Sequence, residues 1–500
     1  MQTGTLITLA LYFVLMIGIG LFAWKRSTDT SEGYLLAGRN LSPGVAALSA
    51  GASDMSGWLL LGLPGALYAA GLVEAWIGIG LFCGAVANWI IVAPRLRAQT
   101  EALGNALTIP EFLANRFPEK AVALRVISAL VIVAFFTVYT AAGLVGGGKL
   151  FETAFADLLP ANGLGGGMSD YMLGIWITAG VVLAYTMVGG FLAVSLTDFV
   201  QGCIMVVALV LMPLVVMFGP GGASGDSILA VAAGQPGFLS LTEGLTALGF
   251  VSAVTWGLGY FGQPHIIVRF MAVRSVEDVP AARNIGLAWM AVSLVGALGV
   301  GLAGRAYAER NGLVVDDPET IFIVLADLLF HPLITGFLFA ALLAAIMSTI
   351  SSQLLVSSSS LTEDFYRLFL RKRASEREAV NVGRICVALV ALAAIAIAQD
   401  PDSEVLGLVA NAWAGFGAAF GPLIVLALTW DRMTGAGAVA GLVTGAAVVA
   451  VWIALGWNAN FIGGQGLYEI VPGFVASWIA IVLVSKATVP PPVSYAAKKT

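Results

Sequence analysis

The chain has 500 residues, of which 59% are hydrophobic and only 11% are charged, and its net charge is −5. Because a soluble globular domain carries about 25% charged residues, this composition excludes an ordinary soluble protein. The sequence also lacks the concentrated basic face that nucleic-acid binding needs. Its 60 glycines are typical of membrane helices, in which small residues let the backbones approach closely.

Apolar runs of about 20 residues, long enough to cross the hydrocarbon core of a bilayer, recur along the chain. The first run, 5–24, precedes Lys25 and Arg26, whereas a signal peptide carries its positive charge in front. We therefore expect a retained helix with its N-terminus outside. The thirteen predicted spans, in chain order, are 5–24, 44–70, 74–94, 123–147, 170–189, 197–219, 244–267, 284–304, 332–360, 380–399, 404–429, 434–457 and 468–486.

The basic residues test this map of spans. With the N-terminus outside, 21 of the 24 Lys and Arg residues fall on the inner side, and only Lys149, Arg305 and Arg310 fall outside. Such a skew follows the positive-inside rule, and a missed span would blur it. We therefore predict 13 transmembrane helices, with the N-terminus out and the C-terminus in.

The polar segments between the spans are short. We expect a small amphipathic helix at 108–117 on the inner face and another at 317–330 on the outer face. Residues 220–240 are expected to form a glycine-rich outer loop. The chain therefore forms a single transmembrane domain over 1–500, with no second soluble domain.

Two of the expected spans contain helix-breaking residues at mid-depth. The second contains the stretch 51–57, and the seventh contains 256–264, both rich in glycine. Irregular backbone survives at membrane depth only where it lines a cavity or is buried in protein. The two spans are five apart, which predicts two inverted five-helix repeats with a binding site at the breaks. The alternative is a pair of ordinary glycine-rich packing helices.

Several polar residues lie within these apolar spans. Asp54 lies in the first break, where placing a carboxylate in the membrane costs roughly 2.5–3.5 kcal/mol. Asp54 is either functional or hydrogen-bonded only to nearby backbone N–H groups. Asp198 lies near the inner end of the sixth span and is either functional or an interfacial helix cap. Ser348 and Thr349 either bond the carbonyls of the preceding turn or help to form an all-oxygen site for a small hard cation.

Aromatic residues near the breaks suggest a substrate pocket. Tyr139, Trp256 and Tyr260 can wall an apolar pocket with polar tips, although aromatic residues in membranes more often serve packing. The three cysteines have neither disulfide nor metal-ligand spacing, and we expect them to be small core residues: Cys83, Cys203 and Cys386.

Five stretches together resemble the sodium:solute symporter family, and within it the bacterial members that carry proline. They are 36–42, 49–58, 189–195, 260–265 and 345–349, and the resemblance extends over nearly the whole chain. It implies an all-α polytopic membrane protein with the LeuT-type 5+5 inverted-repeat fold. The implied parts are a first helix and loop at 5–43, repeat one at 44–219, repeat two at 244–429, two additional helices at 434–486 and a cytoplasmic tail at 487–500.

The resemblance also implies a site. A sodium ion is expected to bind backbone oxygens and hydroxyls of Ala52, Met55, Ala345, Ser348 and Thr349. Asp54 is similar to an essential sodium-linked aspartate of the family, and Asp198 to a carboxylate on the ion's inward route. The implied substrate-contacting residues are Ser56, Gly57, Tyr139, Trp256, Tyr260 and Pro264. One departure is Ser352, where the nearest members are expected to have cysteine.

Other classes of function fit the sequence less well. A channel needs a repeated filter loop or rings of charge, and an enzyme needs a nucleophile–base pair or metal ligands; neither stands out. We therefore expect a transporter, not an enzyme, that imports L-proline with co-transported sodium by alternating access across a bacterial cytoplasmic membrane. No nucleic acid or obligate protein partner is expected. The alternative is a sodium symporter for another small solute of the same family.

Overall fold

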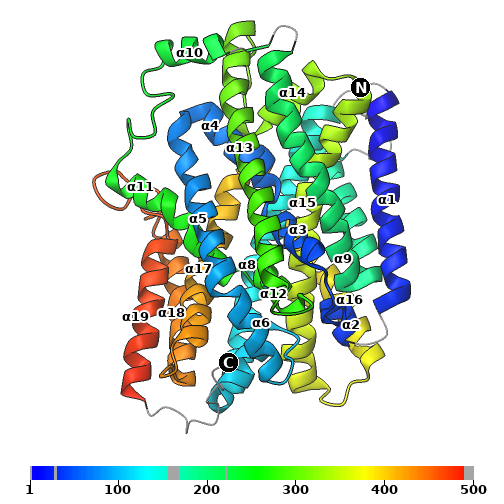
Figure 1. Ribbon diagram of the computed structural model, residues 1–500, viewed down its shortest axis with the longest axis vertical. Coiled ribbons are helices and arrows are strands. Elements are labelled where there is room, and N and C mark those ends of the chain that lie inside the picture. Colours follow the sequence, from blue (N-terminus) through cyan, green and yellow to red (C-terminus); the bar gives the residue numbers. More distant parts are fainter. Residues whose placement is uncertain (1–2, 28–30, 156–167, 220–221, 224, 489–500) are drawn as a thin grey trace.

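The structure, a computed structural model, describes residues 3–27, 31–155, 168–219, 222–223 and 225–488. Those residues form helices and connecting segments, with two isolated β-bridges but no strand among them. Most of the helices run along the long axis of the molecule (Figure 1). The expected tail at 487–500 falls largely outside the described residues.

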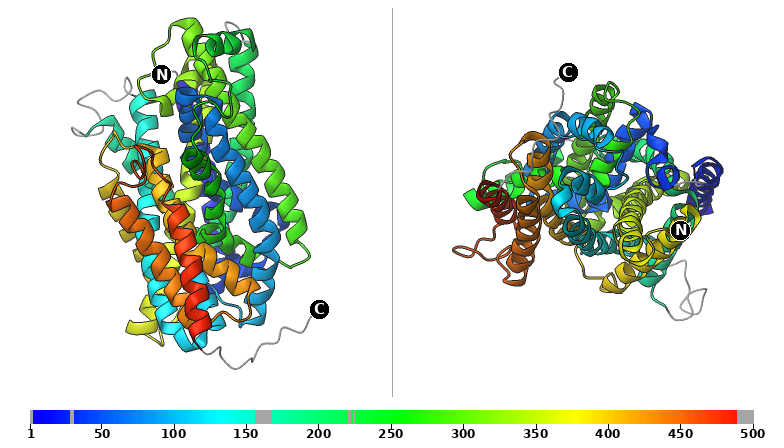
Figure 2. Two further views of the ribbon diagram at one scale, coloured as in Figure 1. Left: turned by 90° about the vertical axis from the view of Figure 1, so that its left-hand side faces the viewer. Right: turned by 90° about the horizontal axis from the view of Figure 1, so that it is seen from below.

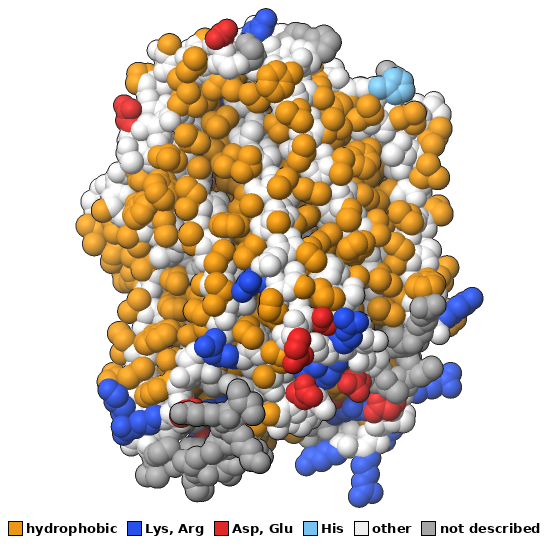
Figure 3. Space-filling view, viewed as in Figure 1, with side chains coloured by type: hydrophobic (Ala, Val, Ile, Leu, Met, Phe, Trp, Pro, Cys, Tyr) orange, Lys and Arg blue, Asp and Glu red, His pale blue; other side chains and the backbone are white. Residues whose placement is uncertain are grey.

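Ten helical segments in the described part of the chain are long and apolar enough to cross a membrane. They are Thr3–Lys25, Leu72–Ala102, Pro118–Phe155, Asp170–Phe218, Val279–Asn311, Pro332–Leu370, Glu376–Ile397, Val405–Thr429, Gly435–Ala454 and Ile470–Ala487. Large apolar side chains cover the outer surface, as lipid contact requires; Val14 and Val295 are each 68% exposed. Figure 3 shows this apolar surface along the middle of the molecule. The chain is therefore an all-helical, multi-pass membrane protein.

The two ends of the molecule differ in charge. On the face drawn in Figure 3, Lys and Arg side chains gather at the lower end and are scarce at the upper end. In Figure 1, α1 (Thr3–Ser27) begins at the upper end, and α19 (Ile470–Ala487) finishes at the lower end. The distribution is the one that the positive-inside rule predicts if the lower end is cytoplasmic.

Both spans that we expected to be interrupted are interrupted. The second consists of α3 (Pro43–Asp54), the π-helical η2 (Trp58–Gly62) and α4 (Leu63–Ala70). The seventh consists of α11 (Ala247–Val254), the 3₁₀-helical η5 (Thr255–Gly262) and α12 (Pro264–Ala272). Glycine lies at both breaks and Pro264 ends the second, and these residues weaken a continuous helical ladder.

Backbone contact explains where the second break lies. At Gly257 in η5, an added Cβ would lie 2.2 Å from the Gly80 carbonyl oxygen of α5 (Ala75–Ile91). The irregular segment therefore rests directly on a neighbouring helix, where only glycine allows such a close approach.

The fifth and sixth expected spans are joined by a bend rather than a loop. A single helical segment, α9 (Asp170–Phe218), changes direction at Gly190, which has φ 60° and ψ −154°. A Cβ at this position would lie 2.5 Å from the Tyr34 ring and 2.7 Å from the Tyr34 carbonyl oxygen. Only glycine fits there, so the expected connection at 190–196 is helical apart from this one residue.

The remaining elements complete the bundle. In chain order they are α2 (Ser31–Leu36), α6 (Ala93–Ala102), α7 (Ile109–Arg116), α8 (Ala121–Phe155), α10 (Gly225–Gly234), α13 (Val279–Asn311), α14 (Ile321–Leu329), α15 (Pro332–Ser359), η7 (Ser360–Leu370), α16 (Glu376–Ile397), α17 (Val405–Thr429) and α18 (Gly435–Ala454). Helices α7 and α14 confirm the short helices expected at 108–117 and 317–330. Residues 220–240, expected to be a loop, contain helix α10.

The expected burial of the cysteines is wrong. Cys83 and Cys203 are exposed and Cys386 is only partly buried. In a membrane helix the lipid-facing side is as apolar as the core-facing side, so an apolar sequence context does not distinguish them.

Helix α15 lies in the interior, and its residues from Leu338 to Ser359 are all buried. The view from below (Figure 2, right) places α18 and α19 together at one edge and α1 near the opposite edge. Helix α15 therefore forms the centre of the interior, and α8, α9 and the two broken segments surround it.

Candidate functional site

The end of α3 presents backbone carbonyl oxygens to groups outside the helix. Asp54 is the last residue of this helix, and Met55 leaves it with φ −81° and ψ 75°. The Ser56 amide bonds the Asp54 carbonyl instead of the Ala52 carbonyl, so the Ala52 oxygen has no partner within its own helix. The Asp54 carbonyl also accepts hydrogen bonds from the Trp58 indole at 3.2 Å and the Tyr139 hydroxyl at 3.4 Å.

The predicted sodium ligands lie where α3 meets α15. The Ser348 hydroxyl donates to the Ala52 carbonyl at 2.7 Å and lies 3.1 Å from the Ala345 carbonyl. The Thr349 hydroxyl lies 3.2 Å from the same Ala345 oxygen. Met55, the fifth predicted ligand, is fully buried at the end of α3. Neutral carbonyl and hydroxyl oxygens of this kind are suitable ligands for a small hard cation.

Asp54 and Tyr260 bring the two broken segments together. The Tyr260 hydroxyl donates to one carboxylate oxygen of Asp54, which is 2% exposed. The other carboxylate oxygen has no hydrogen-bond partner in the described residues. A cavity of only about 20 Å³ adjoins Asp54, Met55 and Tyr260. Such a volume holds about one water molecule, so these side chains must separate to admit an amino acid.

Four other predicted substrate residues surround the same break. Ser56 and Tyr139 are 2% and 1% exposed, and Gly57 precedes η2. Pro264 is buried at the start of α12. The His265 ring that follows Pro264 lies 6.0 Å from the Tyr139 ring, measured between centroids. The structure therefore brings Ser56, Gly57, Tyr139, Tyr260 and Pro264 to one region of the core.

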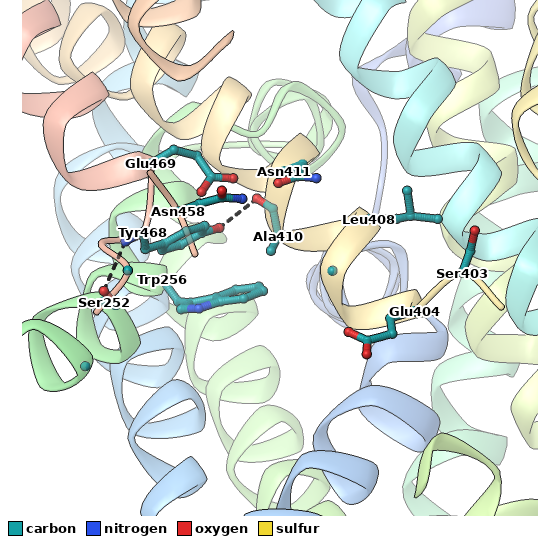
Figure 4. A pocket seen from close by; sticks show the side chains of 13 residues that line it. Ser252, Trp256, Ser403, Glu404, Leu408, Ala410, Asn411, Asn458, Tyr468 and Glu469 are labelled. Carbon is teal, nitrogen blue, oxygen red and sulfur yellow. Dashed lines mark hydrogen bonds between the residues drawn. The ribbon is translucent and has the colours of Figure 1, made fainter. Parts of the chain in front are cut away.

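Trp256 lies apart from this group. Its ring stacks on Tyr468, with centroids 5.1 Å apart, and it lines a separate cavity of about 610 Å³ (Figure 4). Tyr260 instead packs edge-on against Trp413, at 5.1 Å between centroids. The Trp413 indole in turn donates to the Trp256 carbonyl at 2.7 Å. Trp256 and Tyr260 therefore line two different cavities and do not form one wall.

Asp198 lies in a buried ion pair. One of its carboxylate oxygens accepts hydrogen bonds from Ser49 at 2.7 Å and from the Arg269 guanidinium at 3.1 Å. Arg269 also donates to Ser49 and Ser352. Asp198 is fully buried within α9, which excludes the alternative of an interfacial helix cap. The pair links α9 to α12 and, through Ser352, to α15.

The sequence did not predict that Arg269 is buried. It was counted among the inner basic residues, but it is only 1% exposed, in the last turn of α12. A charged side chain at this depth is costly unless it is paired. The available signal was the single unpaired carboxylate at Asp198, for which a buried basic partner is expected.

Side chains of α1 and α9 also hold helix α15 at the residue before the predicted ion ligands. The Tyr185 hydroxyl of α9 donates to the Met347 carbonyl at 3.0 Å. The Tyr12 hydroxyl of α1 contacts the Met347 sulfur at 3.7 Å and accepts a hydrogen bond from Gln201 at 2.8 Å. Met347 immediately precedes Ser348, so α1 and α9 together position the helix that carries the predicted ligands.

The chain is similar to known transporters along almost its whole length. Over 476 residues it is 52% identical to the high-affinity proline transporter PutP of Bacillus subtilis, covering 95% of this chain and 96% of that protein. It is 49% identical to the osmoregulated proline transporter OpuE of the same organism, over 98% of this chain and 96% of OpuE. It is 51% identical to a sodium/proline symporter of Staphylococcus aureus, over 97% of this chain and 93% of that protein.

Solved structures have the same fold. The structure of a sodium-coupled sialic acid symporter in a substrate-bound, outward-open state matches with a TM-score of 0.78 at 18% identity, covering 98% of this chain and 99% of that one. A nucleobase-cation-symport-1 family transporter matches with a TM-score of 0.52 at 14% identity, covering 92% and 96%. The sequence model described as the sodium:solute symporter family matches residues 34–445. This chain therefore belongs to the sodium:solute symporter family.

Proposed function

We propose that this protein imports L-proline together with sodium across a bacterial cytoplasmic membrane, by alternating access. The observation that carries the proposal is the 2.7 Å contact between the Ser348 hydroxyl and the freed Ala52 carbonyl, which joins the broken α3 to α15. We propose proline as the substrate because relatives that are about half identical to this chain are named as proline transporters.

Sodium is proposed to bind the carbonyl oxygens of Ala52, Met55 and Ala345 and the hydroxyls of Ser348 and Thr349. Because both hydroxyls now donate to carbonyls, they must rotate to offer their lone pairs to the ion. Binding would therefore replace helix-to-helix hydrogen bonds by bonds from both helices to one cation. Asp54 and Asp198, both buried near this junction, supply negative charge for the ion's entry and inward exit.

Proline is proposed to bind at the break beside Asp54. Backbone N–H groups of the break near Ser56 and Gly57 suit its carboxylate, while Tyr139, Tyr260 and Pro264 enclose its ring. Trp256 then contributes from the outer side, at the base of the large cavity. For proline to enter, the hydrogen bond between Tyr260 and Asp54 must open, which couples substrate binding to the segment that carries the ion ligands.

Transport follows if sodium stabilises an arrangement that is open to the outside. Rocking of one helical bundle against the other then exposes the same site to the inside. The membrane potential contributes about 2.3 kcal/mol per charge per 100 mV, and the sodium gradient adds to it. A single inward sodium ion therefore makes proline accumulation favourable.

The number and direction of the membrane crossings are also proposed here. We propose 13 membrane crossings with the N-terminus outside, arranged as two inverted five-helix repeats at 44–219 and 244–429, of the LeuT type. The bend at Gly190 supports counting α9 as two crossings, and each broken segment supports one further crossing. Helices α1, α18 and α19 are the additions to the two repeats.

Uptake by purified protein in proteoliposomes tests the function. An imposed inward sodium gradient is expected to drive accumulation of labelled L-proline, and replacement of sodium by choline is expected to abolish it. The alternative is a sodium symporter for another small solute. Excess unlabelled proline that fails to displace a sodium-dependent solute would favour that alternative and refute the assignment of proline.

A further inference from the structure

A second polar cavity lies apart from the proposed ion ligands. It measures about 610 Å³ and is lined by α11, the start of η5, the N-terminal part of α17 and the segment before α19. Its lower wall includes Trp256, which stacks on Tyr468 (Figure 4). The Tyr468 hydroxyl donates to the Ala410 carbonyl at 2.8 Å, which fixes this aromatic pair against α17. The cavity therefore lies on the outer side of the proposed substrate residue Trp256.

Two carboxylates line this cavity, and its lining residues include no basic side chain. Glu404 precedes α17 and is exposed, whereas Glu469 precedes α19 and is 1% exposed. Figure 4 shows the Glu469 carboxylate directed toward Asn411. One of its oxygens has no hydrogen-bond partner in the described part of the protein. Its position at the N-terminus of α19 stabilises the negative charge only partly.

A buried carboxylate with a free oxygen is costly unless a cation approaches it. Burial raises the pKa of Glu469 to about 6, so the group still carries its charge at neutral pH. The other titratable groups that line the cavity are Glu404, at the start of α17, and Tyr468, which precedes Glu469, and neither of them can neutralise it. The stacked faces of Trp256 and Tyr468 add a surface that attracts cations, including organic ammonium groups.

We infer that this cavity is an outer cation site, in which Glu469 and Glu404 capture a small cation before it passes Trp256. The cation is either sodium or the ammonium group of the incoming amino acid, because both match one free carboxylate oxygen in a polar, aromatic cavity. The inference rests on the proposed function in that the captured cation is one of the two co-transported species.

Matched neutral variants test the site. Glu469→Gln and Glu404→Gln remove one charge each with little change of shape. Asp402→Asn is the control, because Asp402 is an exposed carboxylate in the same outer segment that does not line the cavity. Initial uptake rates in proteoliposomes are measured twice: against proline concentration at saturating sodium, and against sodium concentration at saturating proline.

A single ion-pair contact worth about 1 kcal/mol corresponds to a change of about fivefold in half-saturation concentration. We expect Glu469→Gln to produce this change, Glu404→Gln to produce a smaller one and Asp402→Asn to produce none. A shift only in the proline series identifies the ammonium group as the cation, and a shift only in the sodium series identifies sodium. Glu469→Asp, which keeps the charge, should restore much of the wild-type affinity.

Unchanged half-saturation concentrations in both series for Glu469→Gln would overturn the inference, even if the variant were less stable, because Glu469 would then act only as a helix cap. If Glu469→Gln does not fold, Glu404→Gln carries the same comparison against Asp402→Asn. Equilibrium binding of labelled sodium separates the two proposals. If the wild type shows no sodium-dependent proline uptake, the proposed function fails, whereas weaker sodium binding by Glu469→Gln still supports the cation site.

Discussion

Removal of the Ser348 hydroxyl is the most direct test of the proposed ion site. In the structure this hydroxyl donates to the Ala52 carbonyl at 2.7 Å and lies 3.1 Å from the Ala345 carbonyl. Ser348→Ala therefore removes one of the five proposed oxygen ligands and leaves the Ala52 carbonyl without its partner. Loss of a buried polar partner costs about 1–3 kcal/mol, which corresponds to a roughly five- to hundredfold higher sodium concentration for half-maximal uptake.

The neighbouring Ser351 provides a matched control. It is fully buried in the same helix, and its hydroxyl donates to the Ser348 carbonyl at 3.0 Å, so it is not a proposed ion ligand. We expect Ser351→Ala to leave the sodium dependence of proline uptake nearly unchanged, and Thr349→Val to behave like Ser348→Ala. Sodium titrations of uptake and of equilibrium proline binding measure both effects. Wild-type sodium dependence in Ser348→Ala, or equal shifts in Ser348→Ala and Ser351→Ala, would refute the proposed coordination.

Four further perturbations have expected outcomes. Trp256→Ala should weaken proline affinity by about tenfold, since a buried aromatic face is worth roughly 1–3 kcal/mol; competition against labelled proline measures this, and wild-type affinity would exclude Trp256 from the substrate path. In a cysteine-free background, Ala233→Cys should react with an impermeant maleimide in intact cells and Lys372→Cys only after permeabilisation; the reverse would contradict the proposed topology. Glu319→Gln should lower the melting temperature of the protein in detergent by several degrees. The Glu319 carboxylate accepts hydrogen bonds from the buried Lys149 and from two backbone amides at the start of α17. An unchanged melting temperature would show that these contacts add no stability. Because burial raises the pKa of Glu469 to about 6, outer acidification below that value should neutralise the carboxylate and raise the half-saturation concentration in the wild type, and an equal pH response in Glu469→Gln would assign the effect to another group.

The sequence predicted the features that depend on local chemistry. Glycine and proline at 51–57 and 256–264 weaken helices wherever they occur, so both breaks were predictable without tertiary information. Hydroxyls at 348 and 349 fall on a helix that was evident from its length and apolarity. The structure adds the contact between this helix and the Ala52 carbonyl, which spacing along the chain does not specify.

Features that depend on distant contacts were not predictable. Arg269 and Asp198 lie in different broken or bent helices, and nothing local indicates that one neutralises the other. The placement of the Trp256 ring away from Tyr260 depends on Tyr468, which belongs to a segment more than 200 residues later. The exposed cysteines show a further reason, because the lipid-facing and core-facing sides of a membrane helix have similar apolar compositions.

The contacts at Met347 connect the first helix to the proposed ion site. Tyr12 of α1 contacts Met347, the residue that precedes Ser348. From α9, Tyr185 bonds the Met347 carbonyl and Gln201 bonds the Tyr12 hydroxyl. A shortened chain that began after α1 would keep both broken segments and every proposed ligand, yet its α15 would lose one lateral support. Such a protein is expected to bind sodium more weakly although none of the proposed ligands has changed.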